Sequence, residues 1–157
     1  MSLKNINIYF AASIRGGRDF APEYQKLITE LNKYGKVLTE HIANNTLLAQ
    51  EAHLSDEQIH DRDLQWLRES DVVVAEVTQI SMGVGYELAT ALFLNIPVLC
   101  LFNNSQGRKL SAMIKGQTKF THKNYVSLNE AFAAIEHFFA AYFLKQSQNS
   151  IVNNKNN

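Results

Sequence analysis

Three continuous apolar segments, at residues 5–12, 72–77 and 97–102, constrain the fold of this chain more than any other feature of its sequence. They read NINIYFAA, VVVAEV and PVLCLF, and they are rich in β-branched and aromatic residues. Runs this apolar, with Asn5, Asn7 and Glu76 as their polar residues, are typical of strands that are buried on both faces of a sheet. Segments with apolar residues at helical spacing separate the three runs. The sequence therefore predicts an α/β fold with a largely parallel sheet and helices on both of its faces.

The first half of the chain carries clear signals for where its elements start and stop. We expect Asp19 to cap a helix over residues 20–34, which Gly35 ends, and a short strand to follow at residues 36–39. Residues 42–52 are predicted to form a loop or a short helix.

Two further helices follow in the middle of the chain. Ser55 with Gln58 three residues later has the pattern of a capping box, which predicts a helix that runs to about Glu69. Residues 83–94 are apolar on most faces of a helix, so we expect this helix to be packed on both sides.

The C-terminal third is predicted to contain a turn at residues 110–114, a weak strand at 124–127 and a last helix over 129–144. This helix is more apolar than the surface of a monomer requires, so it is either core or a subunit interface. The tail, residues 145–157, is polar and rich in Asn, and we expect it to be disordered. The sequence thus predicts a single domain over residues 1–144.

Composition excludes several classes of protein. The 157 residues include 15 Lys+Arg and 15 Asp+Glu, and this zero net charge argues against a surface that binds a nucleic acid polymer. The single cysteine, Cys100, excludes an intramolecular disulfide and a multi-cysteine zinc site. The sequence also lacks the patterns of a signal peptide and of a membrane span. We therefore expect a cytoplasmic protein, with the nucleus as an additional location in a eukaryote.

Two loops are candidates for binding an anion. The segment SIRGGR, residues 13–18, follows the first predicted strand, and TQISMGVG, residues 78–85, follows the central one. Glycines, hydroxyls, an arginine and a helix N-terminus are the groups that hold a phosphate. Neither loop is a known nucleotide fingerprint, because Leu88 stands where the third glycine of the dinucleotide motif would be. Each loop alone fits a tight turn, but two of them at one sheet edge favour a phosphate site.

Two carboxylates lie near these loops. Glu87 lies four residues after Gly83, within the first turns of an apolar helix, so its side chain is either a surface charge at the helix dipole or a group aimed at a ligand. Asp63 is flanked by apolar residues, but a solvated face or a salt bridge to Arg62 explains it equally well. Two carboxylates that converge on an anomeric carbon are the arrangement of glycosyl chemistry. His41 follows the second predicted strand and is either a ligand contact or a structural residue.

The combination of SIRGGR, TEH, DVVVAEVTQ, GVGYE and LSAMI closely resembles the 2′-deoxynucleoside 5′-monophosphate N-glycosidases. That family belongs to the nucleoside 2-deoxyribosyltransferase superfamily, and the resemblance covers residues 6–116, with a weaker continuation into the last helix. It implies a Rossmann-like fold, a homodimer and no metal or organic cofactor. The implied reaction hydrolyses a deoxynucleotide to free base and 2-deoxyribose 5-phosphate.

The resemblance also implies roles for individual residues. Glu87 would be the nucleophile that forms a deoxyribosyl-enzyme intermediate, and Asp63 would handle the departing base and orient the sugar. Tyr9 completes the implied catalytic set and, with Ile14, would lie along the sugar. His41 and Met113 would lie near the base, and Ser111 would reach the phosphate in the neighbouring subunit's site. The implied phosphate site consists of Ser13, Arg15, Gly16, Gly17, Ser81 and Gly83.

The sequence leaves alternative functions open. A deoxyribosyltransferase would pass the sugar to a second base, although Arg15, Ser13 and Ser81 would then have no phosphate to hold. A hydrolase of a modified ribonucleotide would differ only in how Tyr9 and Ile14 crowd the 2′ position. A nucleotide sensor without turnover is a third alternative, which the presence of both carboxylates disfavours.

Overall fold

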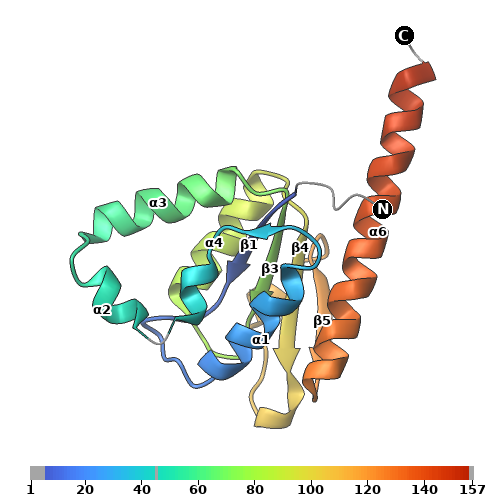
Figure 1. Ribbon diagram of the computed structural model, residues 1–157. Coiled ribbons are helices and arrows are strands. Elements are labelled where there is room, and N and C mark those ends of the chain that lie inside the picture. Colours follow the sequence, from blue (N-terminus) through green and yellow to red (C-terminus); the bar gives the residue numbers. More distant parts are fainter. Residues whose placement is uncertain (1–5, 45, 156–157) are drawn as a thin grey trace.

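A computed structural model of the protein describes residues 6–44 and 46–155, and Figure 1 shows their arrangement. Within these residues the chain forms one five-stranded sheet with the order β2-β1-β3-β4-β5, in which all neighbouring strands are parallel. The prediction of an α/β fold with a parallel sheet is confirmed. The strands are β1 (Asn7–Ala11), β2 (Lys36–Val37), β3 (Val72–Glu76), β4 (Val98–Asn103) and β5 (Thr121–Tyr125).

Helices cover both faces of the sheet, as the apolar strands predict, because successive side chains of a strand point to opposite faces. On one face Ile8 and Phe10 of β1 pack with α1 and α6, and on the other Tyr9 and Ala11 pack with α3 and α4. The α-helices are α1 (Ala21–Leu31), α2 (Leu47–Glu51), α3 (Asp56–Arg68), α4 (Met82–Phe93), α5 (Ala112–Lys115) and α6 (Leu128–Lys155), and short 3-10 helices lie at η1 (Glu40–Ala43) and η2 (Asn104–Gln106). No helix of the described chain is long and apolar enough to cross a membrane.

Helix α3 begins as the sequence predicts. Ser55 Oγ accepts a hydrogen bond from the Gln58 amide at 3.1 Å, and the Gln58 side chain accepts one from the Ser55 amide at 2.9 Å. This capping box satisfies two amides that the first turn would otherwise leave unpaired. It thereby fixes the start of the helix that carries Asp63.

The expected capping role of Asp19 is wrong. Helix α1 begins after Phe20 with a proline in its first turn, and no side chain caps it. Proline suits this position because it has no amide proton to satisfy and its φ is already helical. Asp19 instead accepts a hydrogen bond from Arg108 Nη2 at 3.1 Å, which holds the loop before α1 to the loop after β4.

Helix α6 is longer than expected. It continues to Lys155, whereas the sequence predicts its end at Leu144. The expected disorder of residues 145–157 stays a prediction, and residues 156–157 lie outside the described part of the chain. Lys, Gln and Asn carry no break signal that would end a helix already nucleated on the sheet. The C-terminal part of α6 projects beyond the body of the molecule (Figure 1).

Among the described residues, helix α4 exposes three large apolar side chains, Met82, Tyr86 and Phe93, whereas α6 exposes Leu144. Ala131, Ile135 and Phe139 of α6 are fully buried against the sheet, so the apolar character of this helix is explained by the core. Helix α4 is not packed on both sides as expected, because Met82 is 93% exposed and Phe93 is 86% exposed.

Thr39 completes the sheet where β2 is too short. Strand β2 ends at Val37, and beyond it the Thr39 hydroxyl accepts a hydrogen bond from the Phe10 amide at 2.9 Å and donates one to the Phe10 carbonyl at 2.8 Å. A fully buried hydroxyl therefore takes the place of a backbone partner for β1.

We expect Thr39→Val to lower the free energy of unfolding by roughly 2 to 4 kcal/mol, because it leaves a buried amide and a buried carbonyl of Phe10 without a partner. The matched control is Thr39→Ser, which keeps the hydroxyl and should cost less than the valine. Urea denaturation of the two variants and the parent checks this order, and a valine variant as stable as the serine variant would contradict it.

Candidate active site

A cavity of about 490 Å³ lies beyond the carboxyl ends of β1 and β3, where the two predicted anion-binding loops meet the helices α3 and α4. This is the edge at which parallel α/β sheets bind their ligands. The cavity is lined by seven of the residues predicted from the sequence: Ile14, Arg15, Gly16, Asp63, Ser81, Gly83 and Glu87.

Tyr9 and Glu87 meet at this cavity. Tyr9 lies in the middle of β1 with its ring against α3 and α4, and its hydroxyl donates a hydrogen bond of 2.6 Å to Glu87 Oε1. Burial raises the pKa of Tyr9 far above its usual value, and the negative charge of Glu87 raises it further, so the phenol stays protonated and acts as a donor. One oxygen of Glu87 is therefore held while the carboxylate borders the cavity.

Burial also raises the pKa of Glu87, to about 7. The hydrogen bond from Tyr9 lowers this pKa, while the nearby charge of Asp63 raises it. A carboxylate in this environment is poorly hydrated and changes its protonation state near neutral pH. Groups of this kind are typical of a nucleophile or a general acid–base.

Asp63 lies on α3 and forms a salt bridge with the neighbouring Arg62, one of the two alternatives that the sequence left open. Arg62 Nε donates to Asp63 Oδ1 at 2.9 Å, and Arg62 Nη2 lies 2.8 Å from the same oxygen. Burial raises the pKa of Asp63, and the hydrogen bond and charge of Arg62 lower it. The salt bridge does not remove Asp63 from the site, because Asp63 also lines the cavity.

The first loop is held close to the second by its glycines. A Cβ atom at Gly16 would lie 2.8 Å from the Ile80 carbonyl oxygen and 2.9 Å from Ser13 Oγ, so a larger residue does not fit there. Gly17 has a φ of +118°, a conformation that side chains disfavour. Gln79 of the second loop donates a hydrogen bond of 2.7 Å to the Gly16 carbonyl. The two loops therefore form one connected unit.

Polar groups on both loops suit an anion. Ser13 is fully buried, and its hydroxyl has no hydrogen-bond partner among the described residues. Ser81 is the N-cap of α4, where its Oγ accepts from the Val84 amide at 3.3 Å. The positive end of the α4 dipole and its first amides therefore point toward the cavity beside Gly83. Together these groups form a candidate phosphate site.

Arg15 is not free in this structure. Its guanidinium Nη1 forms an exposed salt bridge of 2.8 Å with Asp56 at the start of α3, and both residues line the cavity. An exposed ion pair of this kind contributes little free energy. Arg15 can therefore exchange Asp56 for the phosphate of a ligand at low cost.

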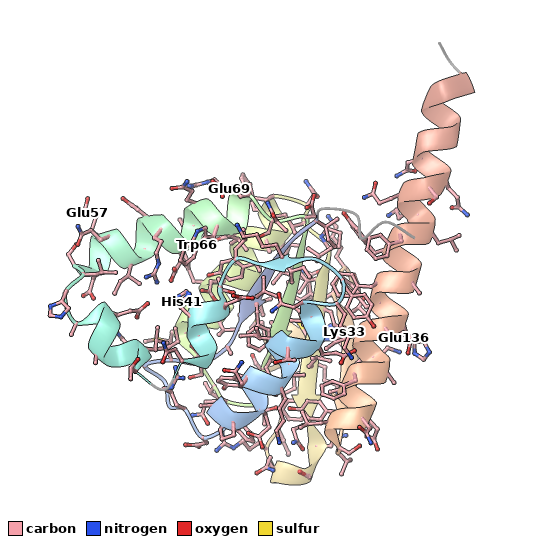
Figure 2. All side chains as sticks on the ribbon, viewed as in Figure 1. Lys33, His41, Glu57, Trp66, Glu69 and Glu136 are labelled. Carbon is pink, nitrogen blue, oxygen red and sulfur yellow. The ribbon has the colours of Figure 1, made fainter. Side chains whose placement is uncertain are left out.

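The remaining predicted residues lie outside this cavity. Tyr9, Ser13 and Gly17 do not line it, although Tyr9 contacts Glu87 and Ser13 and Gly17 belong to the first loop. His41 and Trp66, both labelled in Figure 2, line a second cavity of about 370 Å³. The centres of their two rings lie 5.1 Å apart. Ser111 and Met113 line a third cavity of about 370 Å³ between α4 and α5, which also contacts Ser81. The structure therefore does not bring His41, Ser111 or Met113 to the carboxylates of their own chain.

Sequence reasoning missed Glu51 and gave Arg62 only a bystander role. Glu51 is 6% exposed, lines both the main cavity and the His41 cavity, and accepts a hydrogen bond of 2.6 Å from Arg62 Nη2. No signal identified it, because residues 42–52 gave no clear element. Among the described residues, no group of three or more His, Cys, Asp or Glu side chains is arranged to hold a metal ion.

Comparison with known proteins places the chain in a family. The family model described as nucleoside 2-deoxyribosyltransferase matches residues 8–136. The chain belongs to this family. A protein of Rattus norvegicus named 5-hydroxymethyl-dUMP N-hydrolase is 46% identical over 149 residues, which cover 92% of this chain and 91% of the relative. A protein of the same name from Danio rerio is 54% identical over 112 residues, which cover 71% of this chain and 78% of the relative.

Solved structures support the fold of this family. A CMP N-glycosidase of Clostridium botulinum superposes with a TM-score of 0.60 at 18% identity, over 84% of this chain and 98% of its own. A 2-deoxyribosyltransferase of Bacillus psychrosaccharolyticus gives a TM-score of 0.59 at 19% identity, over 80% of this chain and 90% of its own. At these identities the similarity establishes the family's fold for this chain.

The raised pKa of Glu87 predicts how Glu87→Gln changes stability with pH. The folded protein holds the Glu87 proton up to about pH 7, whereas an unfolded glutamate loses it near 4.5. The folded state therefore binds more protons between these values, and the wild type loses stability as pH rises through them. The glutamine side chain has no such loss, so its stability relative to the wild type should be higher at pH 8 than at pH 5.

Thermal or urea denaturation of Glu87→Gln at both pH values measures this difference. The control is Glu57→Gln, which removes an exposed carboxyl on α3. If the free energy of unfolding of Glu87→Gln differs from that of the wild type by the same amount at both pH values, Glu87 is already ionised in the folded protein at pH 5.

Proposed function

We propose that this protein hydrolyses the N-glycosidic bond of 2′-deoxynucleoside 5′-monophosphates, with free base and 2-deoxyribose 5-phosphate as products. The observation that carries the proposal is one cavity that combines a partly buried carboxylate, Glu87, with polar groups from two loops that suit an anion. The names of the relatives, 5-hydroxymethyl-dUMP N-hydrolase, support the same reaction and identify the first substrate to assay.

Glu87 is the nucleophile of the proposed reaction. An oxygen of the ionised carboxylate forms a bond to the anomeric carbon, the glycosidic C–N bond breaks, and its electron pair leaves with the base, which then takes up a proton. Water attacks the resulting deoxyribosyl ester, the carboxylate leaves, and the water's second proton goes to solvent. The bond from Tyr9 to Oε1 supports attack by the other oxygen, Oε2.

Asp63 is the second carboxylate of the proposed site. Its position on the cavity wall, close enough to raise the pKa of Glu87, supports contact with the sugar and the departing base. Ile14 lines the same cavity and would border the sugar together with Tyr9. His41 is proposed to lie near the base, and the Glu51–Arg62 pair separates its cavity from that of Glu87.

The phosphate explains why the substrate would be a nucleotide rather than a nucleoside. Ser13, Arg15, Gly16, Gly17, Ser81 and Gly83 form the proposed phosphate site. Binding energy from this non-reacting group would hold the anomeric carbon against Glu87. Departure of the base is easier from 2-deoxyribose than from ribose, because no electron-withdrawing 2′-hydroxyl opposes the positive charge that develops on the sugar.

We expect Glu87→Ala to lower kcat by several orders of magnitude, because it removes the group that forms the covalent bond to the sugar in the proposed reaction. Arg15→Ala should instead raise KM roughly ten- to hundred-fold with a smaller change in kcat, because a charge-assisted contact to phosphate is lost. Release of free base from 5-hydroxymethyl-dUMP, dUMP and dGMP, followed by chromatography, measures both variants.

A labelled acceptor base in the same assay separates hydrolysis from transfer. Formation of 2-deoxyribose 5-phosphate without labelled nucleotide supports the hydrolase, and base exchange would favour the transferase. Absence of free base from every deoxynucleotide tested would contradict the proposed function.

We also propose that the protein is a homodimer in which Ser111, together with Met113, contributes to the neighbouring site. The apolar cavity between α4 and α5 supports this, since Ser111 and Met113 line it and the exposed side chains of Met82 and Ile80 border it. Exposed apolar surface of this kind on a small protein is typical of an interface.

Sedimentation is expected to show a dimer at micromolar concentration. Ala89→Asp places a charge in the α4–α5 cavity and should weaken the dimer at least about ten-fold, together with loss of activity. Ala89→Ser keeps the side chain small and is the control. A wild-type monomer with full activity would contradict the dimer.

A cytoplasmic location, with the nucleus as an additional one in a eukaryote, remains a prediction from the sequence.

A further inference from the structure

Arg62 lies between two carboxylates that come from different helices. Its Nη2 donates to Glu51 Oε1 of α2 at 2.6 Å and lies 2.8 Å from Asp63 Oδ1 of α3, to which Nε also donates at 2.9 Å. The guanidinium carbon lies 4.8 Å from the centre of the Trp66 ring, one turn further along α3. Both ion pairs are largely buried, since the side chains of Glu51, Asp63 and Arg62 are 7%, 20% and 24% exposed.

The guanidinium is shared unequally. Asp63 receives two of its nitrogens on one oxygen, whereas Glu51 receives one nitrogen at the shorter distance. Two carboxylates carry two negative charges against one positive charge, so each competes for the same donor. The guanidinium also lies over the Trp66 ring, and this cation–π contact favours its position between the two carboxylates.

This geometry also determines which oxygen of Asp63 is available. Both contacts from Arg62 are made to Oδ1. A carboxylate that is held by one oxygen presents the other, Oδ2, in a defined direction, and Asp63 lines the cavity that contains Glu87. Glu51 lines the same cavity and therefore lies close to the reacting groups without belonging to the proposed catalytic set.

We propose that Arg62 is a positioning residue that holds the Asp63 carboxylate ionised and oriented, and that Glu51 weakens this hold by competing for the same guanidinium. The role in catalysis rests on the proposed function, in which Asp63 contacts the substrate. The electrostatic part concerns the protein alone and can be tested without turnover.

The charged and titratable groups around Asp63 define the expected effects. They are Arg62 and His60 on its own helix, Glu51 on α2, Glu87 on α4 and Tyr9 on β1. Arg62 and His60 lower the pKa of Asp63, and Glu51 raises it. Removal of Arg62 should therefore raise this pKa, and removal of the charge on Glu51 should lower it, because a nearby negative charge is lost and Arg62 is left to Asp63.

The test is a carbon-13 NMR titration of the Asp63 carboxyl in the full chain without ligand. Arg62→Gln should move the Asp63 titration to higher pH, and Glu51→Gln should move it to lower pH. Glu57→Gln, an exposed carboxyl on the same helix, is the control and should leave it in place. Opposite shifts would show that Arg62 and Glu51 act on Asp63 with opposite sign, whereas merely structural contacts would move neither titration.

Two outcomes would overturn the proposal. One is an Asp63 titration that is unchanged in both variants, and the other is a shift in the same direction in both. Arg62→Gln leaves Glu51 buried without a cation, and if this variant fails to fold, the downward shift in Glu51→Gln still decides the question.

Kinetics test the role in catalysis separately. With 5-hydroxymethyl-dUMP as substrate, Arg62→Gln should lower kcat by roughly ten- to hundred-fold and move the acid limb of its pH profile upward, while KM changes less. Arg62→Lys keeps the cation and should restore part of the loss. Unchanged kcat and pH profile in Arg62→Gln, against an active wild type, would overturn the positioning role. An inactive wild type would contradict the proposed function and leave the NMR result to decide on Arg62.

Discussion

The hydrogen bond from Tyr9 to Glu87 joins the centre of the sheet to the helix that borders the cavity. Strand β1 must place Tyr9 on the α3–α4 face, because its neighbours Ile8 and Phe10 occupy the opposite face. Helix α4 must be capped at Ser81 for Glu87 to meet the phenol about 1.7 turns later. The position of Glu87 therefore depends on both the register of the sheet and the cap of the helix.

Burial at this contact has an electrostatic cost that shapes the rest of the site. Burial raises the pKa of both Glu87 and Asp63, which border one cavity, and the charge of Asp63 raises the pKa of Glu87 further. Tyr9 offsets this at Glu87 with a neutral donor, whereas Arg62 offsets it at Asp63 with a full positive charge. Different partners therefore hold the two carboxylates, a neutral phenol at Glu87 and a guanidinium at Asp63.

The sequence predicted the parts of the structure that depend on local pattern. The runs at residues 72–77 and 97–102 are apolar because both faces of the sheet are covered, and the capping box at Ser55 is a contact over three residues. The Glu51–Arg62 contact could not be predicted, because it joins two helices through a segment without periodicity. The role of the Thr39 hydroxyl could not be predicted either. No local pattern indicates that β2 ends after two residues and that a side chain then replaces the backbone as the hydrogen-bond partner of β1. Helix α6 exceeded its predicted end because a polar composition does not distinguish an exposed helix from a coil.

The connection between the two loops affects the end of the proposed reaction as well as its beginning. Gln79 donates a hydrogen bond to the Gly16 carbonyl and accepts one from Arg108, so contacts within the folded chain hold together the two loops of the proposed phosphate site. A preformed site binds without paying for the ordering of its loops. Substrate and sugar product carry the same phosphate, and cleavage does not change that group. The base, which lacks this anchor, would leave first, and departure of the sugar phosphate would be the slow physical step that limits how fast the site empties.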